Sequence, residues 1–138
     1  MNRDEIKNIL PHREPMLLVD EAFIDEDGRA RGSYTVSGDE FFLKGHFPGN
    51  PVVPGVMLCE MMAQVCCVLL SDSASGRTPY FTGLDKVKFK NVVKPKDKIE
   101  FTCEITNIKG PFYFAKGSGT VNGRFCVIGE FSFALIGG

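Results

Sequence analysis

One carboxylate interrupts the longest apolar run of the chain. Residues 55–70 read GVMLCEMMAQVCCVLL, and only Glu60 and Gln64 in this run are polar. An ionised carboxylate in apolar surroundings is costly, so such a group either takes up a proton or finds a partner. A carboxyl that carries a proton near neutral pH is the group that general-acid catalysis needs. Gln64 lies four residues after Glu60, on the same face of a helix, where its amide can orient the carboxyl.

An imidazole precedes the apolar run in a constrained loop. His46 belongs to the segment GHFPGNPVVPG, residues 45–55. The three prolines of this segment each fix a φ angle, which holds a neighbouring side chain in one place, as catalysis requires. The spacing therefore predicts an acid/base pair, His46 and Glu60, in an apolar cavity. The alternative is that both residues have only a structural role, because most buried polar groups make hydrogen bonds that support the fold.

The start of the apolar run offers a site for negative charge. A helix that begins at Gly55, directly after Pro54, exposes free N–H groups and the positive end of its dipole. One such donor stabilises a developing oxyanion by about 3 kcal/mol. An ordinary helix start is the simpler alternative. Met57 and Met61 on the same helix would line a channel for a flexible chain, although core filling explains them equally well.

Composition argues against several classes of function. The net charge is −1 in 138 residues, so bulk charge predicts no binding of nucleic acid. Five cysteines without Cys-x-x-Cys spacing and two distant histidines predict no metal site, and reduced thiols fit a cytoplasmic protein. The N-terminus is too polar for a signal peptide. Pro54, Glu60 and Gln64 interrupt the apolar run, so we expect no membrane span.

Hydrophobic periodicity predicts one long helix and five or six mostly antiparallel strands. We expect a short helix at residues 4–9 and the long helix from residue 55 to about residue 71. Strands are expected at 17–24, 29–36, 82–90, 97–108, 112–121 and 124–135, with a hairpin turn at Asn122-Gly123. The long helix is apolar on nearly every side and must be covered nearly all round. We therefore predict one domain over residues 1–138, with an α+β fold whose strongly curved antiparallel sheet wraps around one long central helix.

Three segments together resemble one protein family. They are residues 10–20 (LPHREPMLLVD), residues 45–56 with Glu60, Ala63 and Gln64, and residues 82–90 (TGLDKVKFK). These segments are similar to the 3-hydroxyacyl-acyl carrier protein dehydratases of the FabZ type, and the resemblance covers nearly the whole chain. It implies a hotdog fold and a homodimer that commonly assembles as a trimer of dimers. The active site would lie at the dimer interface, with His46 from one subunit and Glu60 from the other.

The resemblance also implies a reaction. A (3R)-hydroxyacyl chain on the phosphopantetheine of acyl carrier protein would lose water and become the trans-2-enoyl thioester, without a metal or redox cofactor. His46 would remove the α-proton, the N–H of Gly55 would hold the thioester oxygen, and Glu60 would protonate the departing hydroxyl. The remaining substrate contacts would come from Gln64, Met57 and Met61.

Several interpretations stay open at this point. His12 and Arg13, in the first matched segment, are either structural or lie near the mouth of the channel. The lysines of residues 86–98 either dock the acidic carrier protein or protect a solvated edge strand. Alternative functions are a hotdog acyl thioesterase in which Glu60 activates water, a non-catalytic acyl-binding subunit, and a dehydratase of specialised lipid synthesis.

Overall fold

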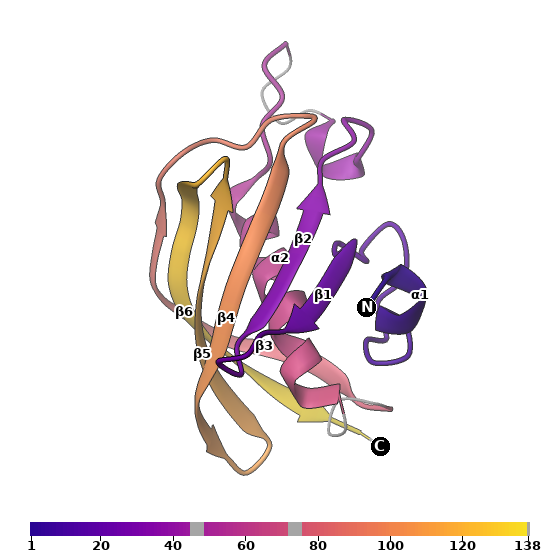
Figure 1. Cartoon of the computed structure of the whole chain (residues 1–138), viewed down its shortest axis with the longest axis vertical. Helices are drawn as coiled ribbons and strands as arrows, with labels where there is room; N and C mark the ends of the chain where they lie inside the picture. Colours follow the sequence, from indigo (N-terminus) through magenta and orange to yellow (C-terminus); the bar gives the residue numbers. More distant parts are fainter. Residues whose placement is uncertain (45–48, 72–75, 138) are drawn as a thin grey trace.

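A computed structural model describes residues 1–44, 49–71 and 76–137. In these residues six antiparallel strands form one sheet, in the order β1-β2-β4-β5-β6-β3 (Figure 1). The strands are β1 (Glu21–Ile24), β2 (Ala30–Thr35), β3 (Thr78–Phe89), β4 (Lys98–Lys109), β5 (Phe112–Val121) and β6 (Arg124–Ile136). Because the order places β1 and β3 at the two ends, these strands are the edges of the described sheet.

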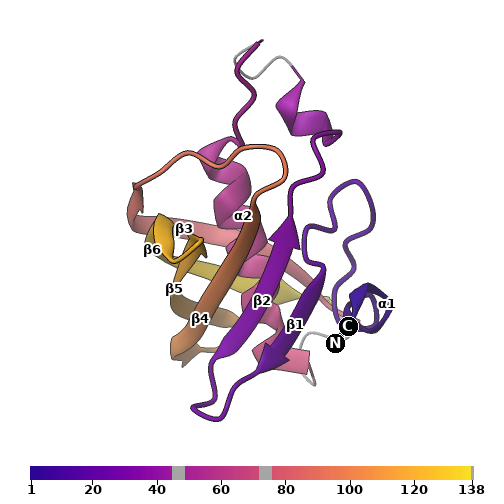
Figure 2. The same ribbon diagram turned by 45° about the horizontal axis from the view of Figure 1, so that its top comes forward.

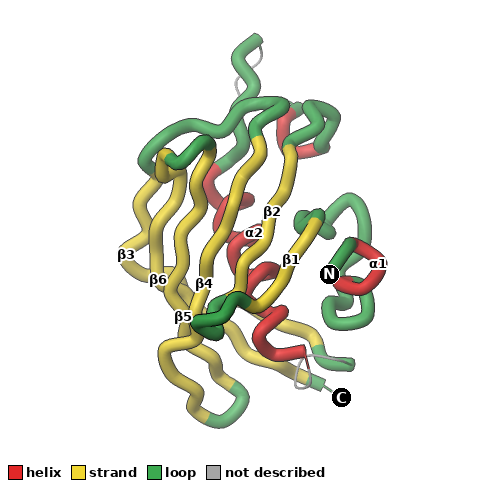
Figure 3. Tube along the Cα trace, in the orientation of Figure 1, coloured by secondary structure: helices red, strands yellow, loops and turns green. Residues whose placement is uncertain are grey.

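The main helix, α2 (Gly55–Cys66), lies against one face of this sheet, and a 3₁₀ helix, η2 (Cys67–Leu70), continues it. Figure 2 shows β1, β2 and β4 on one side of α2, with β3 and β6 curving behind it. The helical segments and strands are also distinguished in Figure 3, where α1 (Arg3–Ile6) and η1 (Phe41–Leu43) complete the set of described helices. The predicted α+β arrangement, a curved antiparallel sheet around one main helix, is confirmed.

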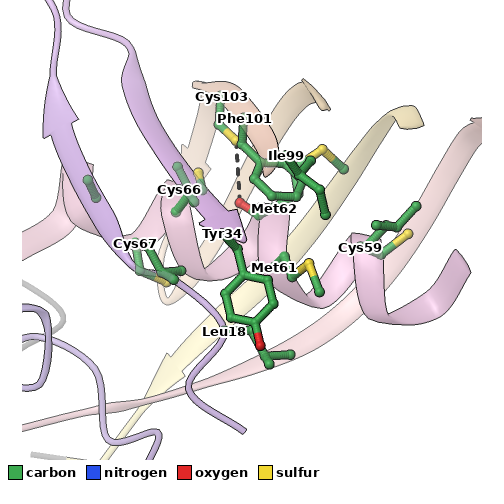
Figure 4. Packing of buried hydrophobic residues seen from close by; sticks show 14 of the residues in the cluster. Leu18, Tyr34, Cys59, Met61, Met62, Cys66, Cys67, Ile99, Phe101 and Cys103 are labelled. Carbon is green, nitrogen blue, oxygen red and sulfur yellow. Dashed lines mark hydrogen bonds between the residues drawn. The ribbon is translucent and has the colours of Figure 1, made fainter. Parts of the chain in front are cut away.

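The core lies between α2 and the concave face of the sheet. Met61 and Met62 of α2 pack among buried residues that include Ile99 and Phe101 of β4 (Figure 4). The Cys103 thiol adds a polar contact, since its Sγ donates to the Met62 carbonyl oxygen at 3.3 Å. Burial of such side chains from water is the main force that holds the helix in the sheet, at roughly 25 cal/mol for each Å² of apolar surface.

Helix α2 and the sheet approach each other closely at a glycine of β2. A Cβ atom at Gly32 would lie 2.7 Å from Cγ2 of Val65 and 3.0 Å from the carbonyl oxygen of Glu21. Contacts this short do not occur between real side chains, so a larger residue at this position would push α2 away from β2. The absence of a side chain at Gly32 therefore sets how near the helix comes to the sheet.

The hairpin between β5 and β6 has the predicted turn. Asn122 and Gly123 have φ angles of 52° and 78°. A two-residue type I′ turn needs positive φ at both central positions, which these two residue types tolerate. The first predicted strand is shorter than expected, because β1 begins only at Glu21. The backbone just before it bonds instead to side chains, including those of Arg3 and Gln64.

Glu40 closes the turn that follows β2. Its carboxylate accepts hydrogen bonds from the Tyr34 hydroxyl at 2.6 Å and from the backbone N–H groups of Ser37 and Gly38 at 2.8 and 2.9 Å. Burial by itself would raise the pKa of Glu40, but these hydrogen bonds outweigh it and lower the pKa from 4.5 to about 2. The folded state therefore favours the ionised form of this carboxyl.

We predict that Glu40 makes part of the stability acid-sensitive. Because the pKa is lowered on folding, its contribution is present above the unfolded value of 4.5 and is lost as the pH falls toward about 2. Urea denaturation of Glu40→Gln should show lower stability at pH 7 and a shallower loss between pH 4.5 and 2 than wild type. Glu26→Gln, a change at an exposed carboxyl, is the control and should keep the wild-type slope. Identical slopes for Glu40→Gln and wild type would contradict the assignment.

Candidate active site

Glu60 lies on the wall of a cavity between α2 and strands β3 and β6. The cavity has a volume of about 160 Å³, and the Glu60 side chain is 21% exposed. Its lining is mostly apolar or aromatic and consists of His12, Glu60, Ala63, Gln64, Cys67, Pro79, Tyr80, Phe81 and Phe133. The carboxyl predicted to do chemistry thus lies where a small part of an apolar ligand would fit.

Gln64 is a buried amide that orients this carboxyl. It is 2% exposed, and its Oε1 accepts a hydrogen bond from the Leu18 N–H at 2.9 Å. Its Nε2 donates to the carbonyl oxygen of Met16 and to Oε2 of Glu60, both at 2.8 Å. The oxygen and nitrogen of the amide cannot exchange places, because the reversed amide would put donor against donor at Leu18. The predicted contact between Gln64 and Glu60 is present.

His12 provides a second nitrogen beside the same carboxyl oxygen. Its Nε2 lies 3.3 Å from Oε2 of Glu60, and its side chain is 19% exposed. The sequence alone leaves His12 open as a structural residue or as one near the channel mouth, and it does not predict the contact with Glu60. A usable signal was present, because Pro11 and Pro15 constrain this segment as the prolines around His46 constrain theirs.

The segment that carries His12 is fixed by an N-terminal arginine. Arg3 donates to the carbonyl oxygens of Leu17 and Val19 at 2.8 and 3.2 Å, and to carboxylate oxygens of Glu14 and Asp20 at 3.0 Å. A guanidinium offers five donors in a rigid fork, so one side chain can hold several acceptors in register. Arg3 therefore stabilises the backbone segment to which the Gln64 side chain is hydrogen-bonded.

Gly55 begins α2 as predicted but lines a different cavity. The N–H of Met57 in the first turn donates to the Pro54 carbonyl oxygen at 3.0 Å, whereas by helix geometry the N–H of Gly55 has no acceptor within the helix. A Cβ at residue 55 would lie 2.7 Å from the ring of Phe89, so glycine is needed for this ring to pack over the helix start. The second cavity, of about 530 Å³, is bordered by Gly55, Phe89 and Val92, and does not include Glu60.

The two methionines proposed for a channel do not border the cavity of Glu60. Met61 is 0% exposed and belongs to the core, and Met57 is half-buried against that core. In the single chain, core filling accounts for Met61 without a ligand. The predicted base, His46, lies outside the described residues.

Comparison with known proteins decides the family. The FabA-like domain family matches residues 10–130. The chain belongs to this family. A 3-hydroxyacyl-[acyl-carrier-protein] dehydratase FabZ from Caldicellulosiruptor bescii is 47% identical over 97% of this chain and 98% of its own length. The FabZ of Clostridium beijerinckii is 44% identical over 98% of this chain and 99% of its own.

Solved structures confirm the fold of this FabA-like chain. The dehydratase heterocomplex ApeI:P from Xenorhabdus doucetiae matches with a TM-score of 0.82 at 21% identity, covering 96% of this chain and 91% of the other. A hypothetical thioesterase from Streptococcus pneumoniae matches with a TM-score of 0.62 at 16% identity, covering 85% of each chain. The predicted hotdog fold is confirmed, and at these identities the two structures show the fold alone.

Cys67 borders the cavity of this FabA-like domain but is a poor nucleophile. Burial, followed by the neighbouring Cys66 and Glu60, raises the pKa of its thiol well above the ordinary value. A protonated thiol does not attack a thioester, since the thiolate is the reactive form. The chemistry of the cavity therefore points to Glu60 and to the groups that hold it.

Two further observations concern metal binding and membrane-spanning helices. In the part of the chain that the structure describes, His, Cys, Asp and Glu side chains form no group of three that could hold a metal ion. Within residues 1–44, 49–71 and 76–137, none of the helices has the length and apolar content needed to cross a membrane. The absence of a metal site stays a prediction.

We predict that Gln64→Leu destabilises the fold as well as releasing the carboxyl. The substitution leaves the buried Leu18 N–H without its partner, which costs about 1–3 kcal/mol, while the part-buried Met16 carbonyl can bond to water instead. Urea denaturation measures the loss. Val56→Ala, at an exposed position on the same helix, should change stability by less than about 0.5 kcal/mol. Wild-type stability of a folded Gln64→Leu protein would show that the amide does not anchor the segment.

Proposed function

We propose that this protein removes water from (3R)-3-hydroxyacyl chains carried by acyl carrier protein, giving the trans-2-enoyl thioester in fatty acid synthesis. One observation carries the proposal. The Glu60 carboxyl, held by Gln64 and beside His12, lies on the wall of an otherwise largely apolar cavity. The FabZ relatives, which match nearly the whole chain, carry this activity in their names.

The elimination needs one base and one acid on the two sides of a carbon–carbon bond. The thioester carbonyl acidifies the α-carbon, and His46 removes its proton. The C–O bond at the β-carbon then breaks, and the hydroxyl takes a proton from Glu60 and leaves as water. The proton on His46 returns to the Glu60 carboxylate through solvent, which restores both groups. Each positioned proton transfer contributes about 10²–10⁴-fold to the rate.

Negative charge builds on the thioester oxygen while the α-proton leaves. The N–H at Gly55 is the donor that we propose for this oxygen, because by helix geometry it has no acceptor within α2 and lies at the positive end of the helix dipole. Met57 and Met61 remain proposed contacts of the acyl chain. Water loss transfers no electrons, so we propose that no cofactor takes part beyond the phosphopantetheine that carries the substrate.

A second copy of the chain is the partner that best fits strand β3. This strand is an edge of the described sheet, and it carries exposed large apolar side chains at Tyr80, Phe81, Leu84 and Phe89. Unprotected apolar edges favour strand pairing between copies. Because Tyr80 and Phe81 also border the cavity of Glu60, pairing along β3 would bring the partner to that cavity. We propose a homodimer, assembled further as a trimer of dimers.

The proposed binding of acyl carrier protein rests on lysine side chains, and the proposed cytoplasmic location rests on the cysteines. Acyl carrier protein is acidic, and the lysines of residues 86–98 supply a complementary surface. All five cysteines are free and buried, which fits a cytoplasmic protein with reduced thiols.

The first prediction of this proposal concerns Glu60. With a 3-hydroxybutyryl thioester, the wild-type protein should form enoyl absorbance, and crotonyl thioester should be hydrated in the reverse direction. Glu60→Gln and His46→Ala should each lower kcat by about 10²–10⁴-fold, because each removes one proton transfer.

Glu104→Gln is the matched control, since Glu104 pairs with Lys116 on the sheet and lies outside the cavity. It should keep wild-type activity. Release of free thiol in place of enoyl product would instead identify a thioesterase, and full activity in His46→Ala would reject the mechanism.

The second prediction tests whether the site is shared between subunits. We expect a mixture of inactive His46→Ala and Glu60→Gln proteins to regain activity after subunit exchange. Half of the dimers would be mixed, and one of their two sites would be intact, so recovery should approach about one quarter of wild type. Mixed dimers verified by mass spectrometry that show no recovery would place both residues in one subunit.

A further inference from the structure

We propose that His12 is a positioning residue that, together with Gln64, keeps Oε2 of Glu60 free of a proton, so that Oε1 is the oxygen that delivers the proton to the leaving hydroxyl. The inference rests on the proposed dehydration and goes beyond it. It names which atom of the acid reacts, and it gives a function to the one imidazole that the described structure places at the cavity.

The hydrogen bonds of Gln64 fix the first half of this assignment. Its Oε1 is engaged by the Leu18 N–H, so the group that meets Oε2 of Glu60 at 2.8 Å is the Nε2 donor. An oxygen that accepts such a bond presents its lone pair to the donor. In a neutral carboxyl the proton therefore resides on the other oxygen, since only one of the two is a hydroxyl.

The second half of the assignment rests on His12, which also borders the cavity. Its Nε2 lies 3.3 Å from the same Oε2 atom, slightly longer than a typical hydrogen bond. Catalytic hydrogen bonds are often long in the free enzyme and shorten when substrate binds. One nitrogen that donates to Oε2 and a second that lies 3.3 Å from it leave Oε1 as the oxygen that no described side chain engages.

The surroundings of the imidazole favour the tautomer that this arrangement needs. Nδ1 of His12 is buried and has no hydrogen-bond partner among the described residues. A proton on Nδ1 would bury an N–H group there without an acceptor, whereas the Nε2–H tautomer leaves only a lone pair buried at that position. The Nε2–H tautomer therefore carries its proton on the nitrogen that lies 3.3 Å from Oε2 of Glu60.

The main chain at His12 is held in place by its neighbour. Arg13 folds back and donates from Nη1 to the carbonyl oxygens of His12 and Leu10, at 2.7 and 2.9 Å. Its Nη2 donates to the carbonyl of Lys7 at 3.3 Å. The guanidinium thus anchors the backbone and leaves the imidazole to contact Glu60, which is the arrangement expected of a residue that acts through another.

The test compares two substitutions at residue 12. Gln places an amide N–H near the position of Nε2 without a titrating ring, and Phe keeps the ring shape without a donor. We expect His12→Phe to lower kcat by about 10–100-fold with KM nearly unchanged, because misplacing a reacting group costs this much. His12→Gln should retain most of the wild-type kcat.

Two outcomes of the kinetics would overturn the proposal. One is wild-type kcat in folded His12→Phe. The other is an equal loss in His12→Gln and His12→Phe, which would mean that the imidazole itself transfers a proton. Circular dichroism checks that each variant is folded.

A spectroscopic measurement keeps the proposal testable even if no substrate is turned over. The chain has only two histidines, so ¹⁵N NMR of His46→Ala reports on His12 alone. We expect the neutral Nε2–H tautomer at pH 7. The Nδ1–H tautomer or an imidazolium would overturn the assignment. Absence of enoyl product in wild type, with the expected tautomer present, would reject the proposed function and keep the contact with Glu60.

Discussion

The candidate site depends on one buried amide. Gln64 joins α2 to the N-terminal segment, because its side chain bonds to the backbone at Met16 and Leu18 and to the Glu60 carboxyl on its own helix. A buried amide with unpaired groups would be costly, so helix and N-terminal segment are constrained to keep this geometry. The same constraint that stabilises the packing thus also orients the proposed acid.

The position of the Gln64 amide depends on how closely α2 approaches the sheet. Gly32 has no side chain, and any side chain at this position would separate β2 from Val65 of α2. The curved sheet then covers most of the helix, as Figures 1 and 2 show, and leaves the edge at β3 and the cavity beside Glu60. The helix therefore buries Val65 against β2 and presents Glu60 to the cavity.

The partners of the Glu60 carboxyl also bear on its proposed role as a proton donor. Glu60 is the acidic residue within the apolar run, and its described partners are an amide and an imidazole rather than a lysine or arginine. A strong cation at this place would hold the carboxylate ionised and oppose its use as a proton donor. The guanidinium groups nearby, Arg3 and Arg13, are engaged by carbonyl and carboxylate oxygens of the N-terminal segment instead.

Much of the fold and part of the candidate site could be predicted from the sequence alone. Alternating and helical periodicities are local properties, so they predicted the curved sheet, the main helix and the Asn122-Gly123 turn. Glu60 stood out because a charge in an apolar run is costly wherever the run folds, and Gln64 followed from helical spacing. The contact of His12 with Glu60 was decided only by tertiary structure, as were the cavity lining and the Phe89 ring over Gly55. These residues are far apart in the chain, by 34 positions for Gly55 and Phe89 and by 48 for His12 and Glu60, and no local pattern encodes which distant side chains meet when the sheet closes around the helix.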